Sequence, residues 1–233
     1  MFRRPIKKIP ILLSSLAAGI LIHGIAADQT AKKTPTPIHR WTRGASLQTA
    51  RSASCAVALA DGRMIVPGGS GESGPLASVE QSLPGGDFVD VQPMREARAD
   101  HSCALLQDGL LLVAGGTTNG GGATNSAELF SADDNQWTAA GSMSTGRAGA
   151  TATTLKDGRV LIAGGRTATG VSNTLEVFDP KTQRFTTLSA MLTSPRADHA
   201  AAASGTAVCS SRAARTARGP WIASMCSIPS RAR

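Results

Sequence analysis

The chain has 233 residues, of which 41% are hydrophobic, 3% are aromatic and none is tyrosine. This length allows one or two domains with a sizeable core. The formal net charge of +8 comes from the two ends, since residues 1–27 hold four Lys/Arg, residues 205–233 hold five Arg, and neither end holds an acidic residue. Residues 28–204 hold 15 basic and 16 acidic side chains. This nearly neutral body argues against a basic nucleic-acid-binding surface, and we expect no nucleic-acid partner.

The N-terminus has the layout of a secretory signal. A basic "MFRRPIKKIP" precedes the apolar run "ILLSSLAAGILIHGIAA", which ends in small residues. We therefore expect a signal peptide over residues 1–27, cleaved after Ala26 or Ala27, and a secreted or periplasmic protein. The alternative is an uncleaved anchor, which is the one way in which we expect the membrane to be a partner. Residues 28–40 are polar, contain proline and are interpreted as a linker.

Three internal repeats follow the linker. "RSASCAVALADGRMIVPGG", "RADHSCALLQDGLLLVAGG" and "RAGATATTLKDGRVLIAGG" each open with an arginine, carry Asp-Gly ten residues later and Gly-Gly seventeen residues later. A glutamate then recurs every 48 residues, at Glu80, Glu128 and Glu176. An aromatic residue stands six residues before a methionine in each repeat. A fixed period of this length is typical of a repeat architecture.

Each repeat predicts four short strands. Two apolar runs are joined by Asp-Gly, which is a strong hairpin signal, and a third strand carries the glutamate. The segment from the aromatic residue to the methionine is the fourth strand. A single sheet of this kind cannot bury both of its faces, whereas sheets stacked radially can. The sequence therefore predicts an all-β fold, a β-propeller.

This pattern resembles the kelch-repeat family, in particular the type found in exported bacterial proteins. The resemblance covers residues 41–204 through the Gly-Gly pairs, the strand ending "EVFDP" and the aromatic residue before the methionine. It implies a closing strand over 41–50 that includes Trp41, blades over 51–97, 98–146 and 147–195, and a partial blade over 196–204. The tyrosine common after Gly-Gly in the family is replaced by Leu129-Phe130 and Val177-Phe178, which still fill an apolar slot.

The basic tail over 205–233 breaks the pattern, because Gly-Thr-Ala stands where Asp-Gly is expected. In a shifted reading frame Trp221 followed by Ile gives Asp, and Met225 followed by Cys gives Val, at the 48-residue period. With GC-rich codons the same frame gives Asp-Gly-Arg, Gly-Gly and Phe-Asp-Pro. We interpret the tail as an out-of-frame fourth repeat, without structure. The predicted fragment, about three blades and the start of a fourth, is truncated, so we expect self-association through open strand edges.

The candidate site residues stand where each repeat begins. In the family the first strand of each repeat lines the central channel, so the entry arginines are expected to ring one mouth and attract anions or sugars. The alternative is that they pair with Glu80, Glu128 and Glu176 between blades. Two entries also carry an Asp-His pair suited to general-base chemistry, although a hydrogen-bonded histidine at a strand start is the simpler interpretation. The candidates are Arg51, Arg98, Asp100, His101, Arg147, Arg196, Asp198 and His199.

The four cysteines suit neither a Cys-x-x-C motif nor the spacing of a zinc site. Two disulfides are one possibility in an exported chain. The interpretation favoured here is that Cys55 and Cys103 are unpaired on buried strands. Cys209 and Cys226 fall in the tail and are expected to carry no chemistry. We expect no metal and no cofactor.

The function predicted from these features is a non-catalytic interaction module that binds a protein or a carbohydrate through loops at one mouth. The alternative is the remnant of a propeller enzyme acting on sugars, similar to kelch-type mutarotases or epimerases. Galactose oxidase, whose propeller resembles kelch repeats, is excluded because its copper-radical site requires tyrosine. A third possibility is a purely structural role.

Overall fold

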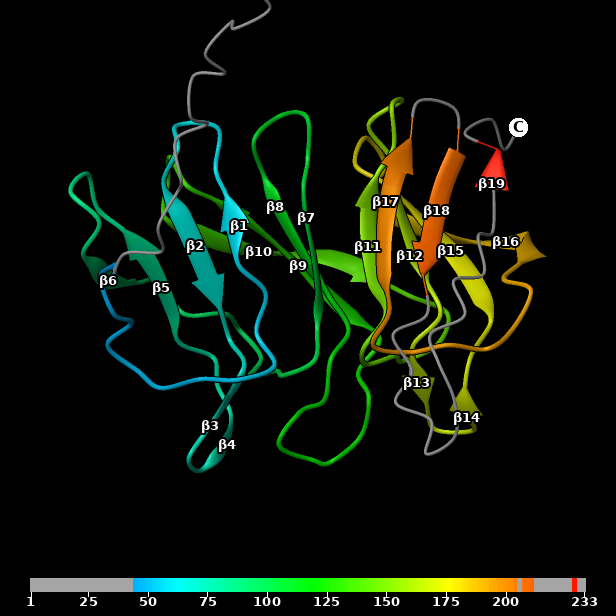
Figure 1. Cartoon of the computed structure of the whole chain (residues 1–233), viewed down its shortest axis with the longest axis horizontal. Coiled ribbons are helices and arrows are strands. Elements are labelled where there is room, and N and C mark those ends of the chain that lie inside the picture. Colours follow the sequence, from blue (N-terminus) through cyan, green and yellow to red (C-terminus); the bar gives the residue numbers. More distant parts are fainter. Residues whose placement is uncertain (1–43, 205–206, 212–227, 230–233) are drawn as a thin grey trace, which may run out of the picture. The chain divides into compact units, whose positions relative to one another are not determined.

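The computed structural model describes residues 44–204, 207–211 and 228–229, shown in colour in Figure 1. The signal peptide and linker predicted over residues 1–40, and Trp41, lie outside these ranges. By its contacts the chain divides into Met1–Thr42 and Arg43–Arg233, and every described residue belongs to the second unit. Within the described ranges no helix has the length and apolarity that crossing a membrane requires.

Three four-stranded antiparallel sheets follow one another along the chain, and their strand order is the chain order. We call them blades 1, 2 and 3. Blade 1 contains β1 (Val57–Ala58), β2 (Met64–Pro67), β5 (Val79–Ser82) and β6 (Phe88–Val91). Blade 2 contains β7 (Ser102–Leu105), β8 (Leu111–Ala114), β9 (Ser126–Ser131) and β10 (Gln136–Ser142). Blade 3 contains β11 (Thr151–Thr154), β12 (Val160–Ala163), β15 (Thr174–Asp179) and β16 (Arg184–Met191). This is the architecture of an all-β, kelch-type propeller fragment.

A fourth sheet of three strands begins the next blade: β17 (Ala200–Ser204), β18 (Ala207–Ser211) and β19 (Ile228–Pro229). The tail predicted to be without structure therefore contributes two strands. The physical reason is that β17 presents a free edge, and the chain returns antiparallel along it. The structure also differs from the prediction of a closing strand over 41–50, because residues 44–50 form no strand.

Two small hairpins project between the second and third strands of blades 1 and 3. They are formed by β3 (Ser70–Gly71) with β4 (Gly74–Pro75), and by β13 (Arg166–Thr167) with β14 (Gly170–Val171). Figure 1 shows both hairpins at the end of their blades opposite the β1–β2 and β11–β12 connections. The corresponding connection of blade 2 is the glycine-rich loop over 117–125.

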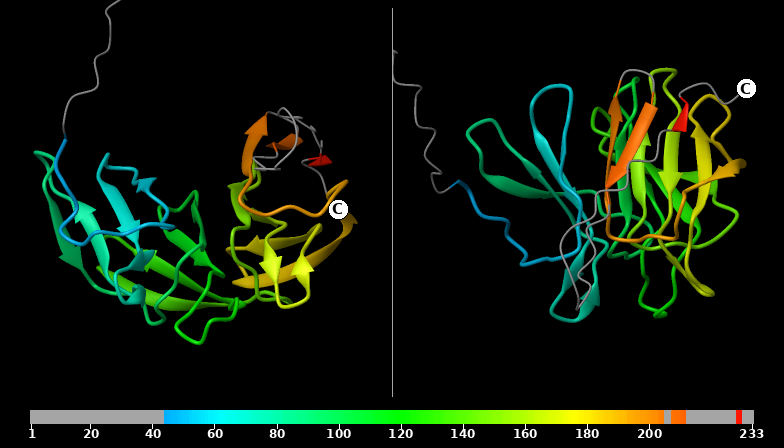
Figure 2. Two further views of the ribbon diagram at one scale, coloured as in Figure 1. Left: turned by 60° about the horizontal axis from the view of Figure 1, so that its bottom comes forward. Right: turned by 45° about the vertical axis from the view of Figure 1, so that its right-hand side comes forward.

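The hydrophobic core lies between successive blades, since alternate residues of a strand face opposite sides of its sheet. In β8, Leu111 and Val113 pack into the core shared with blade 1, whereas Leu112 and Ala114 pack into the core shared with blade 3. A third core joins blade 3 to Ala201 of β17. The first strands β1, β7, β11 and β17 accordingly lie side by side, as the two views of Figure 2 show. Stacking of faces is what buries each sheet.

The Gly-Gly pairs are required by how closely neighbouring blades approach. A Cβ on Gly115 would lie 2.3 Å from the backbone carbonyl of Arg147, and Gly115 has φ of +68°. The next residue, Gly116, donates its N–H to that same carbonyl at 2.9 Å. The pairs of blades 1 and 3 make the same contact with Arg98 and Arg196. Each Gly-Gly pair therefore anchors the arginine that opens the following blade.

Candidate functional site

The four entry arginines are buried. The side chain of Arg51 has no exposed surface, and Arg98, Arg147 and Arg196 are 0%, 1% and 2% exposed as whole residues. Arg51, Arg98 and Arg147 each donate from Nη1 to the carbonyl of the first glycine of the Gly-Gly pair in their own blade, at 2.8 Å. Together with the Gly-Gly contacts, these bonds run from blade to blade through the interior.

Three of the arginines pair with the glutamates of the third strands. The Nη2–Oε1 distances are 2.7 Å for Arg51–Glu80, 2.9 Å for Arg98–Glu128 and 2.6 Å for Arg147–Glu176. The glutamate partners are the ones predicted in the alternative to an arginine-lined mouth, but each pair lies within one blade and not between blades as predicted. Because a buried guanidinium in an ion pair is withdrawn from ligands in solvent, we assign these residues to the architecture.

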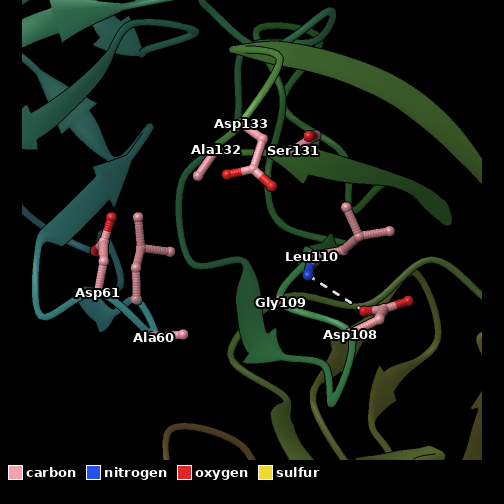
Figure 3. A pocket seen from close by; sticks show the side chains of 9 residues that line it. Ala60, Asp61, Asp108, Gly109, Leu110, Ser131, Ala132 and Asp133 are labelled. Atoms are coloured by element: carbon pink, nitrogen blue, oxygen red, sulfur yellow. Dashed lines mark hydrogen bonds between the residues drawn. The ribbon is translucent and has the colours of Figure 1, made fainter.

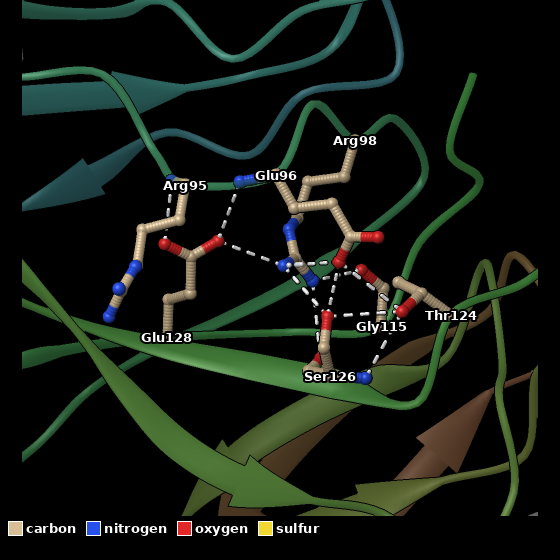
Figure 4. Close-up of polar contacts among 7 residues, drawn as sticks. All are labelled: Arg95, Glu96, Arg98, Gly115, Thr124, Ser126 and Glu128. Carbon is tan, nitrogen blue, oxygen red and sulfur yellow. Dashed lines mark hydrogen bonds and ion pairs between the residues drawn. The ribbon is translucent and has the colours of Figure 1, made fainter.

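Arg98 shows how completely such a side chain is held (Figure 4). It donates to the carbonyl of Ser126 at 3.2 Å and to the Ser126 hydroxyl at 2.9 Å, and it lies 3.1 Å from Glu96 Oε2. Glu128 in turn accepts the backbone N–H groups of Arg95 and Glu96 at 2.8 and 3.2 Å. The pair thus fixes the segment that enters the blade.

The matching carboxylate of blade 1 is Glu80. Burial raises the pKa of Glu80, but hydrogen bonds from the backbone N–H groups of Gln48 and Thr49 and the charge of Arg51 outweigh burial, so that the net pKa is lowered. The carboxylate is therefore ionised when it receives these donors. In blade 1 the backbone N–H groups of residues 48–49 donate to Glu80, as those of residues 95–96 donate to Glu128 in blade 2.

A run of backbone hydrogen bonds joins the blade entries two residues after each arginine. Asp100 N–H donates to Ala53 O at 2.8 Å, Gly149 N–H to Asp100 O at 2.7 Å, and Asp198 N–H to Gly149 O at 2.8 Å. All four residues have φ between +52° and +63°, the left-handed region. Asp tolerates this conformation better than most residues, whereas Ala53 is an unusual occupant.

This run brings together two of the predicted site residues, Asp100 and Asp198. Between them lies the guanidinium of Arg166, from β13, which donates to Asp100 Oδ2 at 3.0 Å and to Asp198 Oδ2. Gly149 stands between the two aspartates in the run and has no side chain to occupy this space. The three side chains are 37–58% exposed, so this cluster is open to solvent. We call it the Asp-Arg-Asp cluster.

The two predicted histidines lie inside, at junctions between blades. His101 is 8% exposed, and its Nε2 lies 3.4 Å from Cys55 Sγ of blade 1. His199 is 7% exposed, with Nε2 3.3 Å from Thr151 Oγ1 of blade 3. Burial, together with the charge of Arg98, lowers the pKa of His101 to about 4. The structure therefore places both histidines at strand starts, each in contact with a side chain of the preceding blade.

The prediction that Cys55 and Cys103 are unpaired is wrong. The structure joins them in a disulfide between blades 1 and 2, with Cα atoms 6.2 Å apart. This separation lies in the range that a disulfide spans, because the first strands of adjacent blades run side by side. Cys226, and the side chain of Cys209, lie outside the described residues.

A cavity of about 220 Å³ lies at the other end of the blades, between the Asp-Gly turns of blades 1 and 2 (Figure 3). Leu59 and Leu110 supply apolar walls, and Asp61, Asp108 and Asp133 supply carboxylates. In the next repeat the position of Ala60 is taken by Gln107, whose amide reaches the carbonyl of Lys156 in blade 3 at 3.1 Å. The small side chain of Ala60 leaves the space between blades 1 and 2 open.

Three features of the site were missed by sequence reasoning. Arg166 directly follows Gly-Gly, where the other repeats have Ser70 and Thr117, and no periodic signal marks it. The 48-residue spacing of Cys55 and Cys103 was a weak signal for the disulfide. The cavity depends on the small side chain of Ala60, and an alanine carries no functional group that would mark the position in the sequence.

Comparison with known proteins adds one finding. Two adjacent segments, residues 98–144 and 146–192, match the Kelch motif. They coincide with blades 2 and 3. No curated protein matches the chain significantly. These matches support a kelch-repeat family for this chain. Kelch motifs in an all-β fragment of four-stranded sheets suggest a β-propeller interaction module, and kelch repeats generally mediate interactions with other proteins.

Proposed function

We propose that the chain is an exported, non-catalytic kelch-repeat protein that binds a protein or carbohydrate ligand through the entry end of its blades. The observation that carries the proposal is the Asp-Arg-Asp cluster. It joins the aspartates of two blade entries through Arg166 of β13, and all three side chains are exposed to solvent. Alternating carboxylate and guanidinium groups match the hydroxyls of a sugar or the polar side chains of a peptide.

The surroundings of the histidines support a binding role over an enzymatic one. A general base must reach the proton that it removes. His101 and His199 are both more than nine-tenths buried, and each directs Nε2 at a side chain of the preceding blade. The alternative, a remnant of a sugar-converting propeller enzyme, would have to use Asp100 or Asp198 instead.

The test is binding of the labelled full chain to a glycan array and to an array of immobilised peptides. Arg166→Glu should abolish any signal seen with the parent, because it places three carboxylates together. Arg159→Ala is the matched control: Arg159 belongs to the same blade, is paired within its own turn to Asp157, and should bind as the parent does. Equal binding by R166E and the parent would exclude the cluster as the ligand site.

The enzymatic alternative has its own readout. The anomeric exchange of reducing sugars, followed by NMR, should be the same with and without the parent chain. Acceleration that is lost in Asp100→Asn would replace the binding proposal with the sugar-converting one.

A further inference from the structure

Three side chains of metal-ligating type meet at the junction of blades 1 and 2. Cys55 precedes β1, His101 precedes β7, and Cys103 lies in β7. Their ligand atoms lie within 4.8 Å of one another, and in the part of the chain that the structure describes they are the one such group of three His, Cys, Asp or Glu side chains. His101 and Cys103 are two residues apart on an extended segment, so both point to the same side of the strand.

The imidazole of His101 lacks a strong partner. Its Nε2 faces Cys55 Sγ at 3.4 Å, and its Nδ1 is buried without a hydrogen bond among the described residues. A disulfide sulfur accepts a hydrogen bond only weakly. Nδ1 of His199 is also buried without a hydrogen bond, so what distinguishes His101 is the pair of sulfur atoms near its ring. A metal ion at Nε2 would take the place of the weak sulfur contact there.

The junction of blade 3 with β17 provides an internal comparison. There Thr151 takes the place of Cys55 and approaches His199 at 3.3 Å, in the same arrangement. The position of Cys103 is taken by Ala201. The contact of a histidine with the preceding blade is thus a recurring part of the architecture, whereas the two thiols occur only at the first junction.

We propose that the reduced chain binds one thiophilic metal ion, of the zinc class, through Cys55 Sγ, Cys103 Sγ and His101 Nε2. Two thiolates and an imidazole are ligands that zinc prefers, and three protein ligands leave a fourth tetrahedral position for water or an exogenous ligand. Zinc–sulfur bonds of about 2.3 Å place the two sulfurs about 3.8 Å apart. The 6.2 Å between the Cα atoms accommodates this separation.

The disulfide and the metal use the same sulfur atoms, so each excludes the other. A dithiol supplies two electrons and two protons to the Cys55–Cys103 bond and becomes a cyclic disulfide itself. The two protein thiols then release two protons when the divalent metal binds. The junction of blades 1 and 2 is consequently closed by a covalent bond under oxidising conditions and by a metal under reducing ones. This site is independent of the proposed ligand-binding cluster.

The experiment titrates Co²⁺ alone into the full chain, anaerobically, in the Cys209→Ser/Cys226→Ser background so that only the two junction thiols remain. After reduction, thiolate-to-cobalt charge-transfer absorption and the visible bands of tetrahedral cobalt should appear and saturate at one ion per chain. The oxidised chain should show neither, and Zn²⁺ should displace the cobalt. A reduced chain with unchanged circular dichroism and no charge-transfer band would overturn the proposal.

Two histidine variants test the third ligand. His101→Ala should weaken cobalt binding by at least about tenfold, since even removal of an outer partner of a metal ligand has an effect of that size. His199→Ala, its counterpart at the thiol-free junction, should leave binding unchanged. If His101→Ala does not fold, His101→Gln serves, since it retains a polar side chain of similar length. Unchanged affinity in either folded His101 variant would show a two-thiol site without the histidine, and the proposal would fail.

Discussion

Arg98 and Glu128 form an ion pair at 2.9 Å in which the arginine side chain has no exposed surface and the glutamate side chain has 4%. Both groups also bind backbone atoms, Arg98 at Gly115 and Ser126, and Glu128 at residues 95 and 96. The pair therefore joins the start of blade 2 to its second and third strands. Removing the pair should therefore destabilise the whole blade.

Arg98→Met should lower the free energy of unfolding by about 3–5 kcal/mol, because it leaves the Glu128 carboxylate buried without its cation. The measurement is urea denaturation followed by circular dichroism. Arg159→Ala should cost about 0.5 kcal/mol or less, since its pair with Asp157 is partly exposed. Equal effects of the two substitutions would contradict the structural role assigned to the buried arginines.

Gly115→Ala should destabilise the chain by more than about 1 kcal/mol. The added Cβ would meet the carbonyl of Arg147 at 2.3 Å, and the positive φ of Gly115 disfavours any side chain. Gly122→Ala is the control, because a Cβ at that position meets nothing within 4 Å. Thermal denaturation of the two variants compares them directly, and a Gly115→Ala variant as stable as Gly122→Ala would refute the close approach of blades 2 and 3.

Acidification should weaken the junction at His199. Burial and the charge of Arg196 lower the pKa of His199 from its ordinary value of 6.5, although Asp198 opposes the shift. The unfolded chain therefore takes up the proton first, and stability falls as the pH drops below about 6.5. Denaturation measured at pH 7 and pH 5 should show a smaller loss for His199→Gln than for the parent. The same loss in both would mean that His199 does not contribute.

Self-association should occur through the face of blade 1 that turns away from blade 2. In the described part of the chain no sheet covers this face, and Met64 on β2 is 41% exposed there. Sedimentation of the parent should show oligomers, which Met64→Lys shifts towards the monomer. Met191→Lys is the control, since Met191 is 58% exposed on the outermost strand of blade 3. A parent chain that is monomeric and melts cooperatively would contradict this prediction.

The nucleotide sequence of codons 196–233 tests the interpretation of the tail. We expect the shifted frame to encode Asp-Gly-Arg, then Gly-Gly, then Phe-Asp-Pro. The strand β17 ends at Ser204 and β18 begins at Ala207, on either side of the position at which the spacing from Arg196 predicts the turn of a fourth repeat. An immediate stop codon in that frame would mean that the tail is a genuine part of the protein.

The sequence alone predicted the strands, the Asp-Gly turns and the Gly-Gly pairs, because these depend on neighbours along the chain and on the period of the repeat. Residues 98–195 follow that period closely, and in the structure they contain two four-stranded sheets, β7–β10 and β11, β12, β15 and β16. The apolar slot predicted for Phe130 and Phe178 is also confirmed, with exposures of 1% and 0%.

Which side chains meet between blades depends on how the sheets pack, and this could not be predicted from the sequence. Cys55 is the fourth residue after Arg51, whereas Cys103 is the fifth after Arg98, so the repeat pattern does not align them. The stacking of β1 beside β7 nevertheless brings them together. Likewise, the sequence left two possibilities for the arginines, a mouth or an ion pair, and the structure shows a buried pair within each of blades 1, 2 and 3. Spacing along the chain determines which face of a strand a residue occupies. Contacts across a junction depend also on the relative placement of two sheets, and a local sequence pattern does not determine that placement.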